Sequence, residues 1–155
     1  MRPVAEYVAN AEQEVALNNP ILFSASIPCN KGYVWHPDES GIFVLRGKVN
    51  NPNCCFARYQ VTFNGNIAIP EEGEVTPIAV AITEFGEPRL TSRAIFTPAD
   101  ADEYGNVTST AIITIPAGCC VSVSVRAVAA TNDVTVTPAP AINVQNANLV
   151  IDRIA

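Results

Sequence analysis

The clearest pattern in the chain is a strict alternation of apolar and polar side chains that runs from Cys55 to Phe63. The apolar residues occupy every second position, and the polar residues Arg58, Gln60 and Thr62 lie between them. Successive side chains of an extended chain point to opposite faces, so a period of two is typical of a strand that buries one face. The stretch therefore predicts a half-buried β-strand.

The pair Asn64-Gly65 ends this alternation and belongs to the residue types that most readily adopt positive φ in a tight turn. A three-residue loop at this point would place Ile67 opposite Phe63 and would keep one face of the strand pair apolar. The sequence therefore predicts either a bulged hairpin here or a strand that bends across to a second sheet.

The rest of the chain reads as short apolar segments separated by Pro, Gly and Asn. Further strands are expected at 14–17, 20–24, 33–36, 42–49, 75–85, 90–97, 106–115, 119–130, 134–136 and 141–154. Only residues 3–12 could wind into a local helical turn. About ten strands at regular spacing predict an all-β sandwich or barrel, and 155 residues suit a single domain.

Charge is sparse along the chain. Charged residues make up 15% of the sequence, against about a quarter in typical domains, so much of the surface is expected to be covered by other copies of the chain. A net charge of −6, with nine Lys and Arg scattered singly, argues against a nucleic-acid partner. No apolar run has the length of a membrane span, and the first residues lack the apolar core of a signal peptide. We therefore expect a protein that either acts in the cytoplasm or leaves the cell by lysis.

The five cysteines are Cys29 and the adjacent pairs Cys54-Cys55 and Cys119-Cys120. None shows the C-x-x-C spacing of a zinc or redox site. Three interpretations stay open: small buried apolar residues at strand ends, a disulfide between Cys29 and one of the pairs, or a metal site with His36.

His36, Asp38, Glu39 and Ser40 are the residue types of a nucleophilic triad, but all four lie on one turn. A triad needs a base and an orienting group that converge on the nucleophile, and residues of one turn cannot do this. The segment is interpreted as a surface turn. Likewise, the three like charges at 71, 72 and 74 repel one another and predict a solvated turn, not a catalytic pair.

The acidic loop after residue 98 offers a weak calcium candidate made of Asp100, Asp102 and Glu103. Gly105 stands at the sixth position of a calcium loop, but Ala111 stands where a bidentate Glu is required. A solvated loop is therefore preferred, with calcium as the alternative.

Three segments, 20–24, 41–45 and 59–63, together resemble the first half of the complement and tumour-necrosis-factor-like jelly roll. Residues 146–154 resemble the closing strand of that family. Nearly all of residues 5–155 are also similar to compact proteins of gut bacteria and their phages, through the motifs at 63–68, 116–120 and 142–149. Two departures are the missing collagen-like stalk and the missing secretion signal.

This resemblance implies a ten-stranded jelly roll that assembles as a homotrimer around a threefold axis. Residues 1–20 would form an N-terminal docking segment with the first strand, and residues 21–155 the jelly-roll domain. The side chains expected at the axis are apolar or aromatic, with ordinary monomer core as the alternative for each: Tyr59, Val61, Phe63, Leu149 and Ile151.

No catalytic motif and no cofactor motif is present in the sequence, which predicts a protein that is not an enzyme. The resemblance favours a structural protein of a phage virion surface: a trimeric head decoration, a head fibre or a tail-associated domain that contacts the host. Its expected partners are other virion proteins and host glycans. The alternative is a recognition head on a bacterial cell or spore surface that binds glycan or protein.

Overall fold

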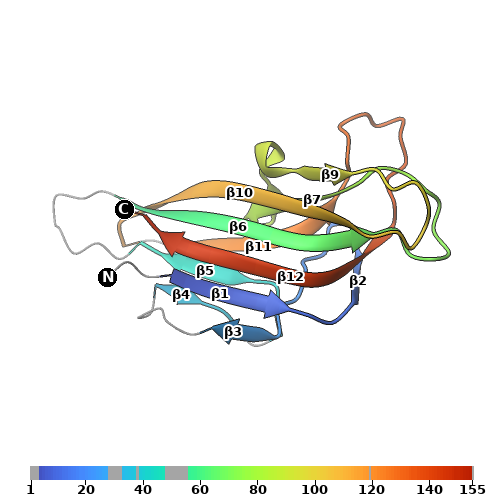
Figure 1. The fold of residues 1–155 in the computed structure, drawn as a ribbon. Coiled ribbons are helices and arrows are strands. Elements are labelled where there is room, and N and C mark those ends of the chain that lie inside the picture. Colours follow the sequence, from blue (N-terminus) through green and yellow to red (C-terminus); the bar gives the residue numbers. More distant parts are fainter. Residues whose placement is uncertain (1–3, 28–32, 38, 48–55, 119, 155) are drawn as a thin grey trace.

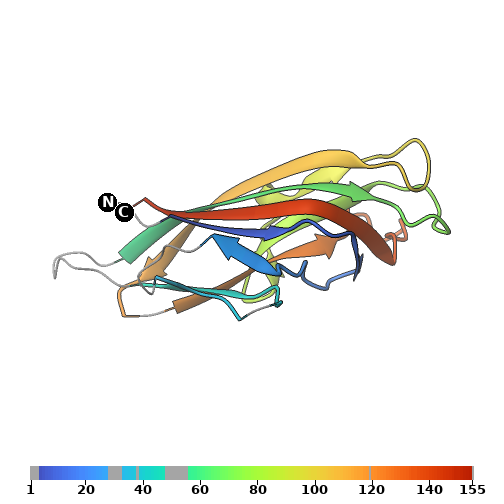
Figure 2. The same cartoon turned by 60° about the horizontal axis from the view of Figure 1, so that its bottom comes forward.

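The computed structural model describes residues 4–27, 33–37, 39–47, 56–118 and 120–154. These residues form two six-stranded antiparallel sheets that lie face to face as a sandwich (Figure 1). Figure 2 shows the two layers, with β12 and β10 in one and β11 and β5 in the other. None of the helical segments described is long and apolar enough to cross a membrane.

Sheet A has the strand order β10-β6-β12-β1-β3, and β2 pairs with the other end of β12. Its strands are β1 Val4–Ala9, β2 Gln13–Ala16, β3 Ala25–Ile27, β6 Phe56–Ala68, β10 Gly105–Pro116 and β12 Ala141–Arg153.

Sheet B has the order β4-β5-β11-β7-β8, and β9 pairs with β7. Its strands are β4 Val34–Trp35, β5 Phe43–Arg46, β7 Ile78–Glu84, β8 Glu87–Pro88, β9 Ala94–Phe96 and β11 Cys120–Val128. A short 3-10 turn, η1 Leu90–Ser92, joins β8 to β9. The predicted all-β sandwich is confirmed, although the described residues contain twelve strands where about ten were expected.

One apolar core fills the space between the sheets, and β6 contributes to it at every second position. The hydroxyl of Tyr59 on β6 donates a hydrogen bond of 2.7 Å to the backbone carbonyl of Arg46 on β5, which links the two sheets. The strand predicted from the alternation is therefore present, and its predicted apolar face is the buried one.

The turn predicted at Asn64-Gly65 is wrong. β6 continues through this pair as one strand of 13 residues and stays in sheet A, so it forms neither a hairpin nor a crossing between sheets. The alternation passes through Gly65 because Phe63, Gly65 and Ile67 are spaced by two and all face the core. A continuous strand therefore places the apolar residues on one face just as the predicted three-residue loop at 64–66 would.

Gly65 lies opposite a β-bulge in β12. Asn64 pairs with Asn148 and Asn66 pairs with Gln145, so two residues of β12 face this single glycine. One of the two, Asn146, has a φ of 53°, a left-handed conformation that is typical of such bulges. The ring of Phe63 covers the glycine, and a Cβ added there would lie 2.9 Å from the ring atom Cζ. The glycine therefore makes room for both the aromatic ring and the bulge.

We expect Gly65→Ala to lower the free energy of unfolding by about 1–3 kcal/mol, because the added methyl must displace a fully buried ring. Urea unfolding measures the change. The matched control is Asn66→Ala on the outward side of the same strand, which loses a hydrogen bond to Asn106 and costs about 1 kcal/mol or less. Equal stability of Gly65→Ala and the wild type would contradict the close packing at this glycine.

The N-terminal residues belong to the sandwich. β1 pairs with β12 along its whole length, and β2 pairs with β12 at residues 141–144. The predicted segment 1–20 thus contributes two strands to sheet A, while its role as a docking segment stays a prediction; the local helical turn predicted at 3–12 is wrong. Residues 20–24 make only isolated bridges, and no strand forms at 134–136.

Candidate functional site

The five side chains predicted for a threefold axis all lie inside a single chain. Each is at most 1% exposed and belongs to the core between the sheets. On neighbouring strands Leu149 pairs with Phe63, and Ile151 pairs with Val61. Because they face the opposite sheet, these residues, with Tyr59, are monomer core and have no area left for a partner chain. This corrects their assignment to the axis.

The outward face of sheet A is the surface that the sequence reasoning missed. From Phe56 to Asn66 on β6, and from Asn106 to Thr114 on β10, the outward positions carry amide or hydroxyl groups with three exceptions, Phe56, Arg58 and Ile112. We call the polar set the amide–hydroxyl face; it consists of Gln60, Thr62, Asn64, Asn66, Asn106, Thr108, Thr110 and Thr114.

Cross-strand hydrogen bonds order this face. The hydroxyls of Thr62 and Thr110 lie 3.2 Å apart, and the hydroxyl of Thr108 donates to Oδ1 of Asn64 at 3.1 Å. The register of β6 and β10 puts these residues directly opposite one another. Such pairs stabilise a sheet and fix the side chains in place. The result is a nearly uncharged surface whose polar groups are partly satisfied within the chain.

The turn around His36 has no catalytic geometry in the residues described. Nδ1 of His36 lies 2.9 Å from the carbonyl of Ile42, and Nε2 lies 3.2 Å from the carbonyl of Phe23. The Ser40 hydroxyl lies 3.5 Å from Nδ1 of His36, but its shorter hydrogen bond, of 2.8 Å, is donated to the carbonyl of Pro37. The imidazole also stacks on Phe43, with ring centroids 4.1 Å apart. His36 therefore holds the turn against the core and is not placed to act as a base; Asp38 lies outside the described residues.

The side chains proposed for calcium, Asp100, Asp102 and Glu103, are all exposed. Among the described residues, no three His, Cys, Asp or Glu side chains are grouped to hold a metal ion. The chain enters β10 at Gly105 and stays extended, so Ala111 is carried away from the loop and into the core. The loop cannot wrap around an ion as a calcium loop does.

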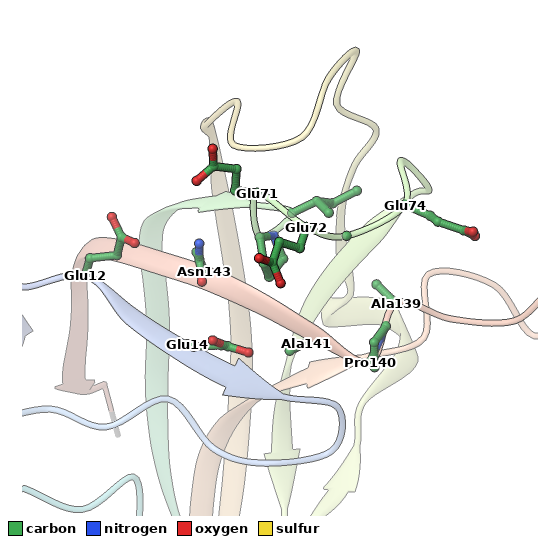
Figure 3. A pocket seen from close by; sticks show the side chains of 12 residues that line it. Glu12, Glu14, Glu71, Glu72, Glu74, Ala139, Pro140, Ala141 and Asn143 are labelled. Atoms are coloured by element: carbon green, nitrogen blue, oxygen red, sulfur yellow. The ribbon is translucent and has the colours of Figure 1, made fainter.

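An acidic crevice of about 510 Å³ lies where β2, β12 and the loop after β6 meet (Figure 3). Its carboxylates come from Glu12, Glu14, Glu71, Glu72 and Glu74. Strand pairing explains part of the cluster, because Glu14 on β2 lies opposite Asn143 on β12. The turn at 71–74 was predicted to be a solvated group of like charges, and the structure adds two more from a distant part of the chain. This end of the molecule therefore carries a strong negative potential.

Tyr104 lies beside this acidic region, and burial raises the pKa of its hydroxyl to about 12; the neighbouring Glu12 carboxylate adds to the shift. In the unfolded chain the same group titrates near 10.0. The folded protein thus keeps a proton that the unfolded chain loses, and stability should fall as pH rises from about 10 to about 12.

We expect Tyr104→Phe to lose less stability over this interval than the wild type, as measured by urea midpoints at successive pH values. Some dependence will remain, because burial also raises the pKa of Tyr59. Identical alkaline profiles for the two proteins would contradict the assignment.

Of the five cysteines, only Cys120 lies among the described residues, where it begins β11 with an exposed side chain. This position does not match the predicted role of a small buried apolar residue at a strand end. Cys29, Cys54, Cys55 and Cys119 lie outside the described residues.

The topology of the two sheets is shared with solved structures of known proteins. The globular domain of zebrafish complement 1qA protein aligns with a TM-score of 0.62 and 12% identity over 100% of this chain and 98% of that one. The chain has the jelly-roll fold of the C1q and TNF-like proteins.

Two further jelly rolls align over nearly their whole length. Eiger TNF from S. frugiperda gives a TM-score of 0.65 at 11% identity, over 99% of this chain and 93% of that one. Murine APRIL gives 0.57 at 12% identity, over 99% and 100%. No protein-family model and no curated protein matches the sequence. At this level of identity the likeness to these jelly rolls is one of fold.

Proposed function

We propose that this jelly roll is a non-enzymatic structural protein that assembles as a homotrimer through the amide–hydroxyl face and is displayed on the surface of a phage virion. The observation that supports the assembly most is the character of that face. Arg58 is the only charged side chain among the outward positions of 56–66 and 106–114.

The low charge matters because a buried charge must be desolvated at an interface, whereas hydroxyl and amide groups can exchange water for hydrogen bonds with a partner. The ordered cross-strand pairs also favour association, since side chains that are already fixed lose little freedom on binding. Two exposed apolar side chains add area to such an interface: Phe56 at the start of β6, and Ile112, which lies opposite Gln60 within the face; they are 40% and 44% exposed.

We base the virion location on the resemblance, drawn from the sequence, of the motifs at 63–68, 116–120 and 142–149 to proteins of gut bacteria and their phages. The acidic crevice lies at the opposite end of sheet A from the start of β1 and the end of β12, which pair with each other. With the chain ends near the particle, the acidic loops would face outward, toward the host.

Two measurements test the proposal. Light scattering of the purified protein should give about three times the chain mass of 16.5 kDa, and a monomer mass at micromolar concentration would refute the assembly. Mass spectrometry of purified particles from the host culture should detect the protein at a stoichiometric level. Its recovery with spore or cell-envelope fractions, and not with particles, would favour a bacterial recognition head instead.

A further inference from the structure

An apolar hollow of about 240 Å³ lies on sheet B, on the opposite layer from the amide–hydroxyl face. It is next to the acidic crevice, because the segments 74–77 and 138–140 contribute walls to both. Its walls come from three parts of the chain: residues 76–77 before β7, residues 95–97 on β9, and residues 129–138 after β11. Two walls carry prolines, Pro77 and Pro138. Because proline fixes its own φ, these walls are stiff.

Ala130, which lines the hollow, also contacts a group of small buried side chains on sheet B. Ala79, Ala81 and Val128 form a buried apolar cluster separate from the main core, with Ala130 packed against it. Ala79 pairs with Ile95 on β9, so the Ile95 side chain rises on the same outward side of the sheet. The hollow therefore lies beside small buried residues of sheet B, and Ile95 forms one of its walls.

No described residue closes the hollow. Ile95 is 51% exposed and Val136 is 43% exposed, although both line the hollow. An apolar cavity of about 150 Å³ is large enough to hold benzene. The space on sheet B therefore suits a molecule about the size of a phenyl ring with a short side chain.

The guanidinium of Arg93 lies beside the hollow, because it bonds to Ala129, one of the lining residues. Nη1 of Arg93 donates to the carbonyl of Ala129 at 3.3 Å and to Oδ1 of Asn132 at 3.1 Å, and both acceptors are neutral. No described carboxylate forms an ion pair with this guanidinium. Asp133 follows Asn132 in the sequence, and its carboxylate accepts hydrogen bonds from the backbone N–H and the hydroxyl of Thr135. The charge of Arg93 is thus left for an anion from outside the chain.

We propose that this hollow binds a small hydrophobic carboxylate. The apolar body of the ligand occupies the space between Ile95 and Val136, and its carboxylate accepts hydrogen bonds from Arg93. Guanidinium and carboxylate groups match in geometry, and their charge-assisted hydrogen bonds are stronger than neutral ones. This binding site is independent of the trimer and of the virion location.

The test uses 3-phenylpropionate as the probe and its uncharged amide, 3-phenylpropanamide, as the matched ligand control, each titrated into the full-length protein and followed by NMR. The acid should bind saturably and about tenfold more tightly than the amide, as expected when a charge-assisted hydrogen bond replaces a neutral one. Absence of saturable binding of the acid, or equal affinity for both ligands, overturns the proposal.

Two variants at the exposed residue Ile95 locate the ligand. Ile95→Glu places a like charge beside the carboxylate and should abolish binding of the acid, whereas Ile95→Lys, of similar size and opposite charge, should retain it. Arg93→Gln should bind acid and amide equally. Because Arg93 also holds the 129–132 segment, circular dichroism and the melting temperature accompany each variant, and Ile95→Glu carries the test if Arg93→Gln unfolds. The site is overturned if a folded Ile95→Glu binds the acid as tightly as the wild type does. It is also overturned if the probe lowers the particle mass of the wild type, because a second copy of the chain would then occupy the hollow.

Discussion

Replacing Phe63 by Ala is expected to lower the free energy of unfolding by about 3–5 kcal/mol, a large part of the total stability of a domain of this size. Phe63 is completely buried, pairs with Leu149 across the strand boundary and covers Gly65. Truncation removes buried apolar area and leaves a cavity, because close packing on both sides limits how far the core can collapse. Urea unfolding should show a lower midpoint with an unchanged slope.

Phe56→Ala is the matched control, since it makes the same chemical change on the same strand but on the outward side. Phe56 is 40% exposed and lies against the Arg58 guanidinium, whose carbon is 4.4 Å from the ring centroid. Its loss should cost about 1 kcal/mol or less. If Phe63→Ala instead kept the wild-type stability while reducing the particle mass, Phe63 would belong to the threefold axis after all.

Thr110→Arg is expected to reduce the particle mass from about three chains to one chain of 16.5 kDa. Thr110 is exposed in the single chain and lies in the middle of the amide–hydroxyl face. In the proposed trimer, three added cations would be brought together and stripped of water, which costs several kcal/mol for each buried ion. In the separated chain the long side chain reaches solvent, so the β-type circular dichroism should be unchanged.

The control is Thr91→Arg, which makes the same substitution at an exposed position in η1, the turn that joins two strands of sheet B and is not part of the amide–hydroxyl face. It should leave the mass unchanged, measured by light scattering at matched protein concentration. A trimer that persists in Thr110→Arg, or one that dissociates in both variants, would contradict assembly through this face.

Much of sheet A could be predicted from the alternation of its residues. The pattern from Cys55 to Phe63 identified β6 and the side of it that is buried. It failed at Asn64-Gly65, because a glycine at an inward position satisfies the period of two without a turn. The signal that decides the question lies far away, in the bulge of β12 that faces this glycine.

β1 was missed for a different reason. Its inward residues Ala5, Tyr7 and Ala9 are buried, but Val4 and Val8 on the outward side are also apolar, so the strand shows no polar–apolar alternation. Pairing with β12 fixes its structure, and that partner is at the other end of the sequence.

The candidate surfaces also differ in whether the local sequence or the pairing of distant strands determines them. The residues of the amide–hydroxyl face on β6 could be read from the sequence, since Gln60 and Thr62 are the polar half of the opening pattern. The acidic crevice could not, because Glu12 and Glu14 reach the turn at 71–74 only through the pairing of β2 with β12. The hollow on sheet B likewise depends on the pairing of Ile95 with Ala79.

The central position of β12 also sets the order in which the protein can form during synthesis. β12 lies between β6 and β1 in sheet A and also pairs with β2, yet it is made after all of them. Until residues 141–153 have been translated, β1 and β6 lack the neighbour that joins them, and their edges remain open. Pairings between distant parts of a chain form slowly, and open edges are prone to pair with other chains. A nascent chain should therefore complete this sandwich only after β12 has left the ribosome, and a chain shortened before residue 141 should aggregate.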